Sequence, residues 1–331
     1  MKRQIAVIGA GQLGSRHLQG VLKSSLKFDV YVVDPFLNSL ETAEDRANEI
    51  EHSHEVFYKK SVSGLPEELD LVIVATNSDV RLRVLKELLK QSKVDTLVLE
   101  KVLFQSLHEY DEAKEIIQNS NTKTFVNHAR RMQELYGGLK NVLEDFKDEA
   151  FDIQFYGSNW GLGCNGLHLS DTISFLFNDT IQYYDNSKLD SDIIASKRMG
   201  FLEFTGTLSG KTIKDHRFRI ISRRTEDSTP SGISMTLNAP SVRIVVNEGG
   251  TEPSIIVTRM NQGANTEIRT FSRMLFQSDL SKIIAEEALS GRVPQLTTYE
   301  DAMVNHKLFI ESLLSHLNLS NTEKINRCPI T

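Results

Sequence analysis

The first part of the chain alternates between short continuous apolar runs and longer stretches whose apolar residues recur at helical spacing. The runs lie at 5–8, 30–33, 69–76, 96–99 and 123–126, and the helical stretches lie at 13–22, 39–51, 80–89 and 107–117. A continuous apolar run suits a strand buried on both faces of a parallel sheet, and the helices between such strands supply the crossovers. The pattern therefore predicts a doubly wound α/β domain over residues 1–126, with ligands bound beyond the carboxyl ends of its strands.

Beyond residue 126 the pattern changes. Helices are predicted at 132–146, 164–177, 272–290 and 298–317, and strands at 151–156, 201–208, 217–221, 233–237, 242–246 and 255–257. Consecutive strands joined by short turns favour an antiparallel sheet with one half-exposed face. We predict an α+β domain over residues 127–331 with a large open, mainly antiparallel sheet, whose last helices are free to pack back on the first domain. An open apolar face requires a cover, which predicts a homodimer or homotetramer.

The composition and charge of the chain mainly argue against certain partners and against a disulfide framework. The chain has 331 residues, 2 cysteines and a formal net charge of −6. An acidic chain without a long basic run argues against a nucleic-acid partner, and no apolar run approaches the roughly 20 residues that span a bilayer. Cys164 and Cys328 cannot form a disulfide framework and fit a reducing compartment. We expect a cytoplasmic protein with no nucleic-acid or membrane partner.

The stretch Gly9–Gly14 follows the first apolar run directly and opens the first helix. It reads Gly-Ala-Gly-Gln-Leu-Gly, and Asp34 ends the second run 20 residues beyond Gly14. In a dinucleotide-binding domain the first glycine permits a tight turn, the second admits the pyrophosphate, and the third lets the helix pack on the sheet. Asp34 suits the ribose hydroxyls and would repel a 2′-phosphate, because residues 35–37 offer no cation. The prediction is NAD rather than NADP; the alternative is an ordinary glycine turn with a solvated acid.

Side chains at the carboxyl ends of the predicted strands should converge on the same ligand. The expected cofactor contacts are Gly9, Gly11, Gln12, Leu13, Gly14, Asp34, Thr76, Asn77 and Glu100. Lys101 follows directly, at the mouth of the expected crevice. An enzyme that oxidises an alcohol needs a group to take the hydroxyl proton, and lysine can do so when its surroundings shift the pKa toward neutrality. The alternative for Lys101 is a solvated lysine paired with Glu100.

A second set of chemical groups lies on the predicted helix after the glycine-rich loop 157–163. Cys164, His168 and Asp171 stand at i, i+4 and i+7, which places them on one helix face. A histidine there could act as an acid/base group. Spacing alone favours plainer interpretations: a core histidine satisfied by a backbone carbonyl and a helix-surface aspartate.

Several segments resemble the Gfo/Idh/MocA family of NAD(P)-dependent sugar and polyol oxidoreductases. They are the loop at 5–14, the stretch 74–77, Glu100-Lys101-Val102-Leu103 (similar to an E-K-P-L signature), the G-x-H-x-x-D match at 166–171, and 293–302. The resemblance implies hydride transfer between NAD and a sugar carbinol without a metal. It implies a catalytic Lys101, His168 as proton-transfer partner and Asp171 orienting it. The rivals are an NAD-dependent glycosidase of the same fold and a non-catalytic dinucleotide-binding regulator.

The chain departs from the family pattern at two positions. Val102 replaces a proline whose bend, often a cis peptide, follows the lysine, so that bend is left open. Cys164 stands where many members carry an aspartate, and a neutral thiol would not hold an imidazolium as a carboxylate does.

The Cys164-Asn165 pair and the segment 126–132 are similar to members associated with surface-polysaccharide and amino-sugar synthesis. That similarity implies an activated or acidic amino sugar, with Arg130 or Arg131 contacting its anion; the alternative is that these arginines are solvated or salt-bridged. The expected substrate contacts are Lys101, Asn127, Arg131, Trp160, Cys164, Asn165 and His168.

Overall fold

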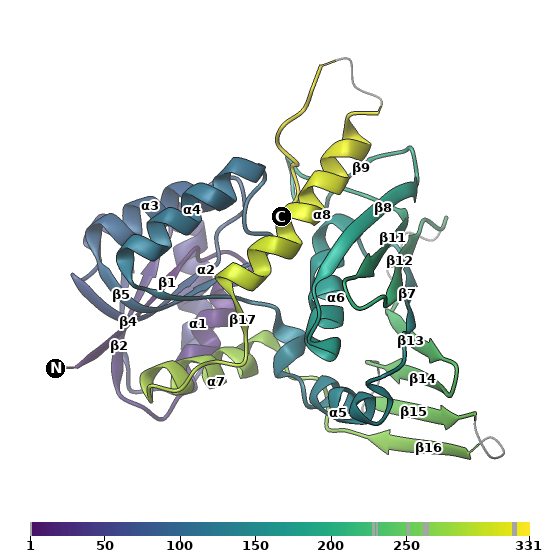
Figure 1. Ribbon diagram of the computed structural model, residues 1–331. Helices are drawn as coiled ribbons and strands as arrows, with labels where there is room; N and C mark the ends of the chain where they lie inside the picture. The colour runs from purple at the N-terminus through teal and green to yellow at the C-terminus, as the bar shows by residue number, and fades with distance from the viewer. Residues whose placement is uncertain (1, 227–228, 230, 250–251, 261–264, 320–322) are drawn as a thin grey trace. The chain divides into compact units, whose positions relative to one another are not determined.

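A computed structural model describes residues 2–226, 229, 231–249, 252–260, 265–319 and 323–331. The chain divides into two compact units (Figure 1). The first comprises Met1–Ala129 and Leu275–Met303, and the second comprises Arg130–Met274 and Val304–Thr331. The sequence-based boundary at 126/127 left the last helices free to pack back on the first domain, and the segment 275–303 is grouped with the first unit.

The first unit is built on a seven-stranded sheet in the order β17-β6-β5-β4-β1-β2-β3. The strands are β1 (Arg3–Ile8), β2 (Phe28–Val33), β3 (Glu55–Lys59), β4 (Glu68–Val74), β5 (Lys93–Leu99), β6 (Lys123–Val126) and β17 (Thr297–Thr298). Neighbours are parallel except β17, which is antiparallel to β6. The order reverses at β1, between β2 and β4, and ligands of open α/β sheets bind beyond such a switch point. The doubly wound prediction is confirmed.

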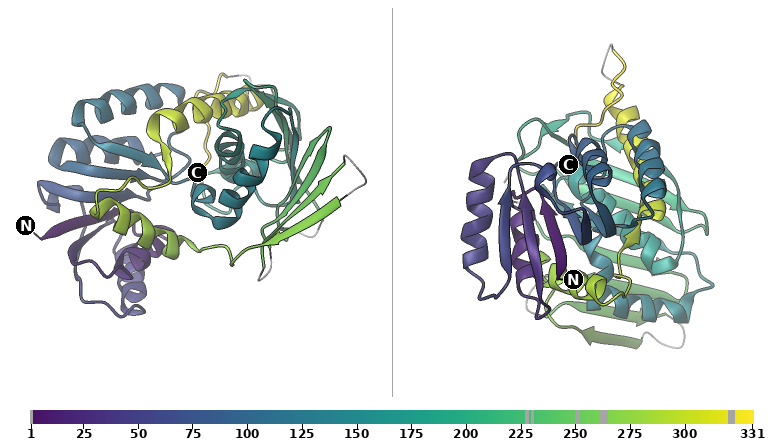
Figure 2. Two further views of the ribbon diagram at one scale, coloured as in Figure 1. Left: turned by 60° about the horizontal axis from the view of Figure 1, so that its bottom comes forward. Right: turned by 90° about the vertical axis from the view of Figure 1, so that its left-hand side faces the viewer.

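Five α-helices cover this sheet. They are α1 (Gly14–Leu22), α2 (Leu37–Asn48), α3 (Arg81–Gln91), α4 (Leu107–Ser120) and α7 (Gln277–Leu289). Helices α3 and α4 pack together on one face, while α1 packs with α2 and α7 on the other (Figure 2). The approach of α7 to α1 is close because Gly20 has no side chain: a Cβ there would lie 2.3 Å from the carbonyl oxygen of Ser278. This close packing of α7 on α1 is one of the contacts that group the segment 275–303 with the N-terminal part of the chain.

The second unit contains an eight-stranded sheet in the order β16-β15-β14-β13-β7-β12-β11-β8. The strands are β7 (Asp152–Ser158), β8 (Ile181–Leu189), β11 (Gly206–Thr212), β12 (Arg217–Arg223), β13 (Ser234–Ala239), β14 (Val242–Asn247), β15 (Ser254–Arg259) and β16 (Asn265–Thr270). Only the β7–β12 pair is parallel among these neighbours. A separate two-stranded ladder joins β9 (Ile194–Ala195) to β10 (Leu202–Glu203). The prediction of a mainly antiparallel sheet is confirmed.

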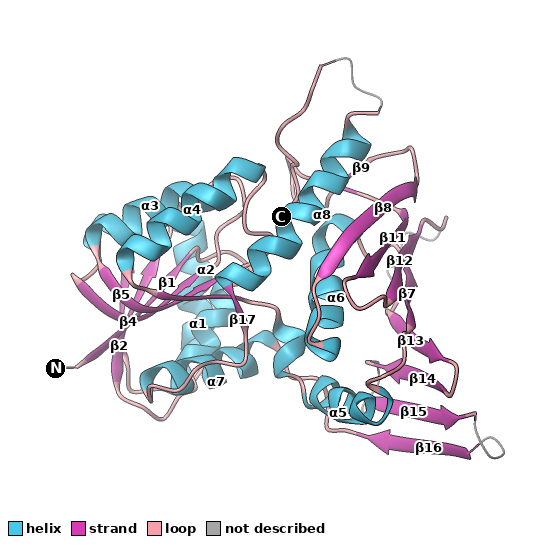
Figure 3. Ribbon diagram, in the orientation of Figure 1, coloured by secondary structure: helices cyan, strands magenta, loops and turns pink. Residues whose placement is uncertain are grey.

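Helices cover one face of this sheet. They are α5 (Glu134–Leu143), α6 (Leu162–Phe177) and the part of α8 (Tyr299–Leu317) that begins at Val304 (Figure 3). Along β12 the side chains alternate between exposed and buried, with Phe218 and Ile220 in the core and Arg217 and Arg219 outside. Among the described residues of this unit, no helix covers the opposite face. That face retains the exposed aromatic side chains of Tyr156 and Tyr183.

The strands absent from the sequence-based prediction lie at sheet edges. β3 and β16 are edge strands, and β16 is exposed along nearly its whole length. β8 is likewise an edge strand with a mostly polar sequence. A strand that buries few side chains carries little hydrophobic periodicity, and only its pairing partner reveals it. The predicted helix at 132–146 is also shorter, because only 134–143 is α-helical.

Candidate functional site

The carboxyl ends of the central strands meet at one edge of the first unit. The amide of Gly9, beyond β1, donates to the carbonyl of Val33 at 2.8 Å, and that of Ala75, beyond β4, donates to Ile8 at 2.7 Å. On the other side, Glu100 N donates to Val74 O at 3.0 Å and Asn127 N to Leu99 O at 2.9 Å. The predicted convergence of the glycine loop with the residues after β4, β5 and β6 is therefore present within this unit.

The three fingerprint glycines have different surroundings. Gly9 has φ +93°, and a Cβ on it would lie 2.8 Å from the backbone of Ala75 and Thr76. A Cβ on Gly14 would lie 1.6 Å from the carbonyl oxygen of Gly9, so any side chain would push α1 off the loop. A Cβ on Gly11 would meet no atom within 4 Å. Gly9 and Gly14 are thus required by the fold, whereas the space beside Gly11 is open to a ligand.

Asp34 ties the end of β2 to the glycine loop. Its Oδ2 accepts the amide of Ala10 at 2.8 Å, and its Oδ1 accepts the amide of Phe36 at 2.9 Å. Each carboxylate oxygen retains a lone pair for a further donor such as a ribose hydroxyl. Phe36 and Leu37 follow two and three residues later with 70% and 55% of their surfaces exposed, which offers an apolar contact near the carboxylate.

Arg46 is a residue of this edge that the sequence patterns did not suggest. From the last turn of α2 its guanidinium donates to the backbone carbonyl of Gln12 at 2.8 Å, and it also bonds the Gln12 and Ser15 side chains. Burial, followed by the charge of Arg16, lowers the pKa of Arg46. The contact holds the exposed part of the glycine loop in place and adds positive charge beside it. No local spacing links position 46 to position 12, so only the tertiary fold identifies the pair.

The residues present fit a dinucleotide. The space beside Gly11 is open, the amino end of α1 offers unsatisfied N–H groups, and these favour a pyrophosphate. The hydroxyl oxygen of Thr76 is buried beside the loop with no hydrogen-bond partner among the described residues. A buried hydroxyl without a partner is uncommon, and a polar ligand at this edge would satisfy it.

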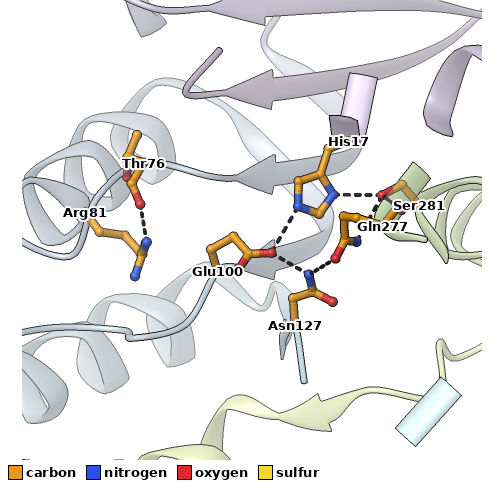
Figure 4. A network of polar contacts seen from close by, with 7 residues as sticks. All are labelled: His17, Thr76, Arg81, Glu100, Asn127, Gln277 and Ser281. Atoms are coloured by element: carbon orange, nitrogen blue, oxygen red, sulfur yellow. Dashed lines mark hydrogen bonds and ion pairs between the residues drawn. The ribbon is translucent and has the colours of Figure 1, made fainter. Parts of the chain in front are cut away.

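Glu100, expected to contact the cofactor, is instead turned into the interior (Figure 4). It is 3% exposed, and its Oε1 lies 3.0 Å from Nε2 of His17, a fully buried residue of α1. The side-chain amide of Asn127 also donates to Oε1 and, at 3.0 Å, to Oε1 of Gln277. Asn127, an expected substrate contact, is thus 2% exposed and belongs to the same internal network. The network was not predicted, because His17 carries no local signal of its role.

The hydrogen bonds define the protonation of this network. The Ser281 hydroxyl donates to the Gln277 backbone carbonyl at 2.7 Å, so Nδ1 of His17, at 2.8 Å from Ser281 Oγ, is the donor there. A proton must then lie between Nε2 and Glu100. Burial raises the pKa of Glu100, but the hydrogen bond and charge of His17, with Asn127 and Lys101, outweigh it and lower the pKa below its ordinary value. Glu100 is therefore a buried carboxylate that accepts hydrogen bonds from His17 and Asn127.

The segment after Lys101 is held from its other side by Arg81. This buried arginine of α3 donates to the carbonyl oxygens of Val102 and Leu103, the latter at 3.0 Å, and to that of Thr76. The Lys101–Val102 peptide is cis although Val102 is not a proline, so the bend left open by the sequence is present. Lys101 itself is partly exposed. It stands between two anchored neighbours at the carboxyl end of β5.

The second unit carries the other predicted site residues. On α6, Cys164, Asn165 and His168 share one partly exposed stripe. Asp171 is buried rather than on the helix surface, and it accepts a bidentate pair of hydrogen bonds from Arg131, both at 2.8 Å. Trp160, Cys164 and Asn165 line one cavity of about 590 Å³.

Both arginines that were expected to contact an anion are instead paired with carboxylates of this unit. Arg130 donates to Glu248 at 2.7 and 3.1 Å, and the hydroxyl of Tyr136 donates to the same carboxylate. Burial acts against both charges, but the mutual attraction raises the pKa of Arg130 and lowers that of Glu248. Arg130 and Arg131 are thus salt-bridged, which was the alternative left open by the sequence.

Comparison with known proteins bears on the first unit most directly. Residues 3–128 match the oxidoreductase family with an NAD-binding Rossmann fold, Gfo/Idh/MocA. This segment is a Gfo/Idh/MocA NAD-binding domain. The resemblance to this family is confirmed for residues 3–128, and so is the expectation of an NAD-binding domain. The similarity to members associated with surface-polysaccharide synthesis is not confirmed. No match is found among functionally curated proteins, and none of the described helices is long and apolar enough to cross a membrane.

Solved structures of similar fold extend the likeness beyond the Gfo/Idh/MocA domain. A scyllo-inositol dehydrogenase from Lactobacillus casei, with NAD(H) and scyllo-inositol, has a TM-score of 0.69 at 15% identity over 97% of this chain and 98% of its own. An Agrobacterium radiobacter oxidoreductase, in complex with NAD+, L-tartaric acid and magnesium, gives 0.74 at 15% identity over 98% of both chains. The transcriptional regulator Gal80p from Kluyveromyces lactis gives 0.70 at 13% identity over 97% and 91%. At such identities the likeness shows the fold alone.

Proposed function

We propose that the protein is an NAD-dependent oxidoreductase that transfers a hydride between nicotinamide and a carbinol carbon of a sugar or sugar derivative. The observation that carries the proposal is the position of Lys101. It follows β5 at the edge that holds the glycine loop, and the residues on either side of it are anchored by His17–Glu100 and by Arg81. A partly exposed amine at that edge suits proton transfer beside a bound dinucleotide.

The chemistry follows from these groups. NAD, when bound, supplies the hydride acceptor. As the carbinol C–H leaves as hydride and the carbonyl forms, Lys101 hydrogen-bonds the hydroxyl and relays its proton. His168 acts as the acid/base partner, so the mechanism requires that both residues reach one substrate. Asp171, which the sequence suggested as the group orienting His168, also holds Arg131 and so connects α6 to the segment before α5. The similar dehydrogenases, one of which is named with scyllo-inositol, support a polyol or sugar as the substrate class.

Loss of the lysine amine tests the proposal. Lys101→Ala should lower turnover by about 10²–10⁴-fold, the usual contribution of a general acid/base group, while NADH still binds. His168→Ala should also lower turnover, by less if Lys101 alone can relay the proton. Lys86→Ala is the matched control, since that exposed lysine only pairs with Glu112 on the surface. The measurements are kcat, KM and NADH fluorescence titration for each variant. Full activity in Lys101→Ala would overturn the mechanism.

Similarity to Gal80p favours one further candidate, a dinucleotide-binding regulator without catalysis. It predicts normal NADH binding with no change in NADH concentration over a broad panel of sugars and polyols. An NAD-dependent glycosidase would instead release sugar with no net change in NADH. Net NADH formation that is proportional to oxidised sugar supports the dehydrogenase and contradicts both rivals.

We also propose a cytoplasmic location, in keeping with the absence of a disulfide between Cys164 and Cys328.

A further inference from the structure

The second unit contains a cavity of about 590 Å³ beside the amino end of α6. Its walls come from the loop before α6, from the residues around β9, and from the end of β12. Among the residues that line it are Trp160, Cys164, Asn165, Lys197, Arg198 and Arg224. The cavity thus combines an indole, an amide and three cationic side chains, and it is large enough for a monosaccharide with a substituent.

The side chains that line this cavity carry three cations, Lys197, Arg198 and Arg224, against the one carboxylate of Glu203. Arg224 lies 3.6 Å from Asp192, but both side chains are largely exposed, where an ion pair contributes little. Lys197 and Arg198 form no ion pair with any described residue. Arginine presents a planar fork that matches a carboxylate or a phosphate, and lysine adds a point charge. Lys197 and Arg198 without an ion-pair partner among the described residues, together with the weakly paired Arg224, favour an anionic ligand at this concave surface.

Glu203 is the one side-chain carboxylate among the lining residues, and it is otherwise engaged. Both of its oxygens lie 3.2 Å from the amide nitrogen of Cys164, at the start of α6. It also packs so closely on the preceding loop that a Cβ on Gly161 would come within 2.8 Å of it. Its charge is therefore directed at the amino end of the helix, where it is stabilised by the helix dipole, and Lys197 and Arg198 keep their charge for a ligand.

The indole and the amide are positioned for a sugar ring. Trp160 Nε1 donates to the carbonyl of Ile221 at 3.2 Å, which fixes the ring plane. The Asn165 side-chain nitrogen donates to the carbonyls of Trp160 and, at 3.1 Å, Gly161, so its oxygen remains to accept a ligand hydroxyl. One turn further along the same stripe of α6 stands His168. A ligand in this cavity would therefore extend toward the residue assigned to proton transfer.

We propose that this cavity binds the anionic substituent of the substrate, a carboxylate or a phosphate carried by a sugar, through Lys197, Arg198 and Arg224. The sugar ring lies against Trp160, and Asn165 accepts one of its hydroxyls. This inference rests on the proposed function, because it assigns the substrate of the same reaction to a negatively charged class. It also replaces Arg130 and Arg131, whose charges are engaged elsewhere, as the anion contacts.

Calorimetric titration of the NADH-loaded full chain with D-glucose, D-glucuronate and D-glucose 6-phosphate tests the proposal. At least one anionic sugar should bind about tenfold or more tightly than glucose, because hydrogen bonds to a charged group are stronger than those between neutral groups. Glucuronate and glucose 6-phosphate distinguish a carboxylate from a phosphate. The variant Lys197→Ala/Arg198→Ala should lose that preference. The control Arg243→Ala removes an exposed arginine of β14 that does not line the cavity and should keep it.

The outcomes separate this inference from the proposed function. If neither anionic sugar binds more tightly than glucose, or if the Lys197/Arg198 variant keeps the preference, the inference is overturned, whatever the turnover. If the anionic preference depends on Lys197 and Arg198 but no sugar changes the NADH concentration, the cavity assignment stands and the dehydrogenase proposal fails. Anion-dependent binding together with NADH turnover supports both.

Discussion

The imidazole of His17 lies 3.0 Å from the carboxylate of Glu100, and both side chains are buried. His17 belongs to the helix that begins at the glycine loop, and Glu100 immediately precedes Lys101. The pair therefore connects the element that presents N–H groups to a pyrophosphate with the residue proposed to move the proton. Because the bond is buried, its loss leaves a polar group without a partner in the interior.

Glu100→Gln should destabilise the protein. The change removes the carboxylate that accepts hydrogen bonds from His17 and Asn127. A buried polar group left without its partner costs about 1–3 kcal/mol. Chemical denaturation at pH 7 measures the free energy of unfolding. The matched control is Glu112→Gln, which breaks an exposed pair with Lys86 and should change that free energy by about 0.5 kcal/mol or less. Equal stabilities of the wild type and Glu100→Gln would contradict a stabilising role for this buried carboxylate.

The same variant should reveal a pH dependence with a defined sign. The pKa of Glu100 is lower in the folded protein than its ordinary value. Its contribution to stability is therefore complete above the unfolded-state carboxyl pKa, about 4.3, and is lost as pH falls through the folded-state pKa. The stability difference between wild type and Glu100→Gln should be largest from about pH 5 upward and shrink in acid. A difference that grows as pH falls would be the opposite of this expectation.

Two glycines of one loop should respond differently to the same substitution. Gly11→Val should fold normally, because a Cβ there meets no atom within 4 Å, but it should lose NADH binding by blocking the pyrophosphate. Gly14→Val should fail to fold or unfold at a much lower temperature, since its Cβ would lie 1.6 Å from the Gly9 carbonyl oxygen. Thermal unfolding and NADH fluorescence titration separate the two effects. Normal NADH affinity in Gly11→Val would exclude the loop as the phosphate site.

Asp34 should make the protein prefer NADH to NADPH. Its carboxylate is fixed by the amides of Ala10 and Phe36, so a 2′-phosphate would meet a negative charge that cannot move away. Titration of both cofactors should give a lower dissociation constant for NADH. Asp34→Ala should bring the dissociation constants of NADH and NADPH closer together, mainly by weakening NADH binding. Equal or tighter binding of NADPH to the wild type would refute the assignment.

The uncovered face of the second-unit sheet should be buried between copies of the chain. Tyr156 lies on β7, inside the sheet between β13 and β12, yet 40% of its surface is exposed. Light scattering at micromolar concentration should show a dimer or a dimer of dimers. Tyr156→Asp should shift the protein toward monomer, whereas Leu319→Asp, at an exposed position outside the sheet, should not. A monomeric wild type would refute this arrangement.

Local patterns were sufficient for much of the fold. The apolar runs that became β1, β2, β4, β5 and β6 are mostly buried, above all toward their carboxyl ends, so consecutive positions carry the signal. The edge strands β3, β8 and β16 were not predicted, because an edge strand is stabilised largely by pairing with a neighbour rather than by its own buried side chains. Helix α7 packs on α1 through a close contact between Gly20 and Ser278, which are far apart in the chain.

The sequence by itself determined the doubly wound domain, the glycine loop and the position of Asp34 after β2, because each depends on residues adjacent along the chain. Only the tertiary structure decided the partners of the charged groups. Glu100 is joined to His17, Arg131 to Asp171 and Arg130 to Glu248. These pairs are separated by 40 to 118 residues, and a side chain's charge does not specify which distant opposite charge the fold will bring to it. The partner decides whether a charge is committed to the interior or remains to bind a ligand.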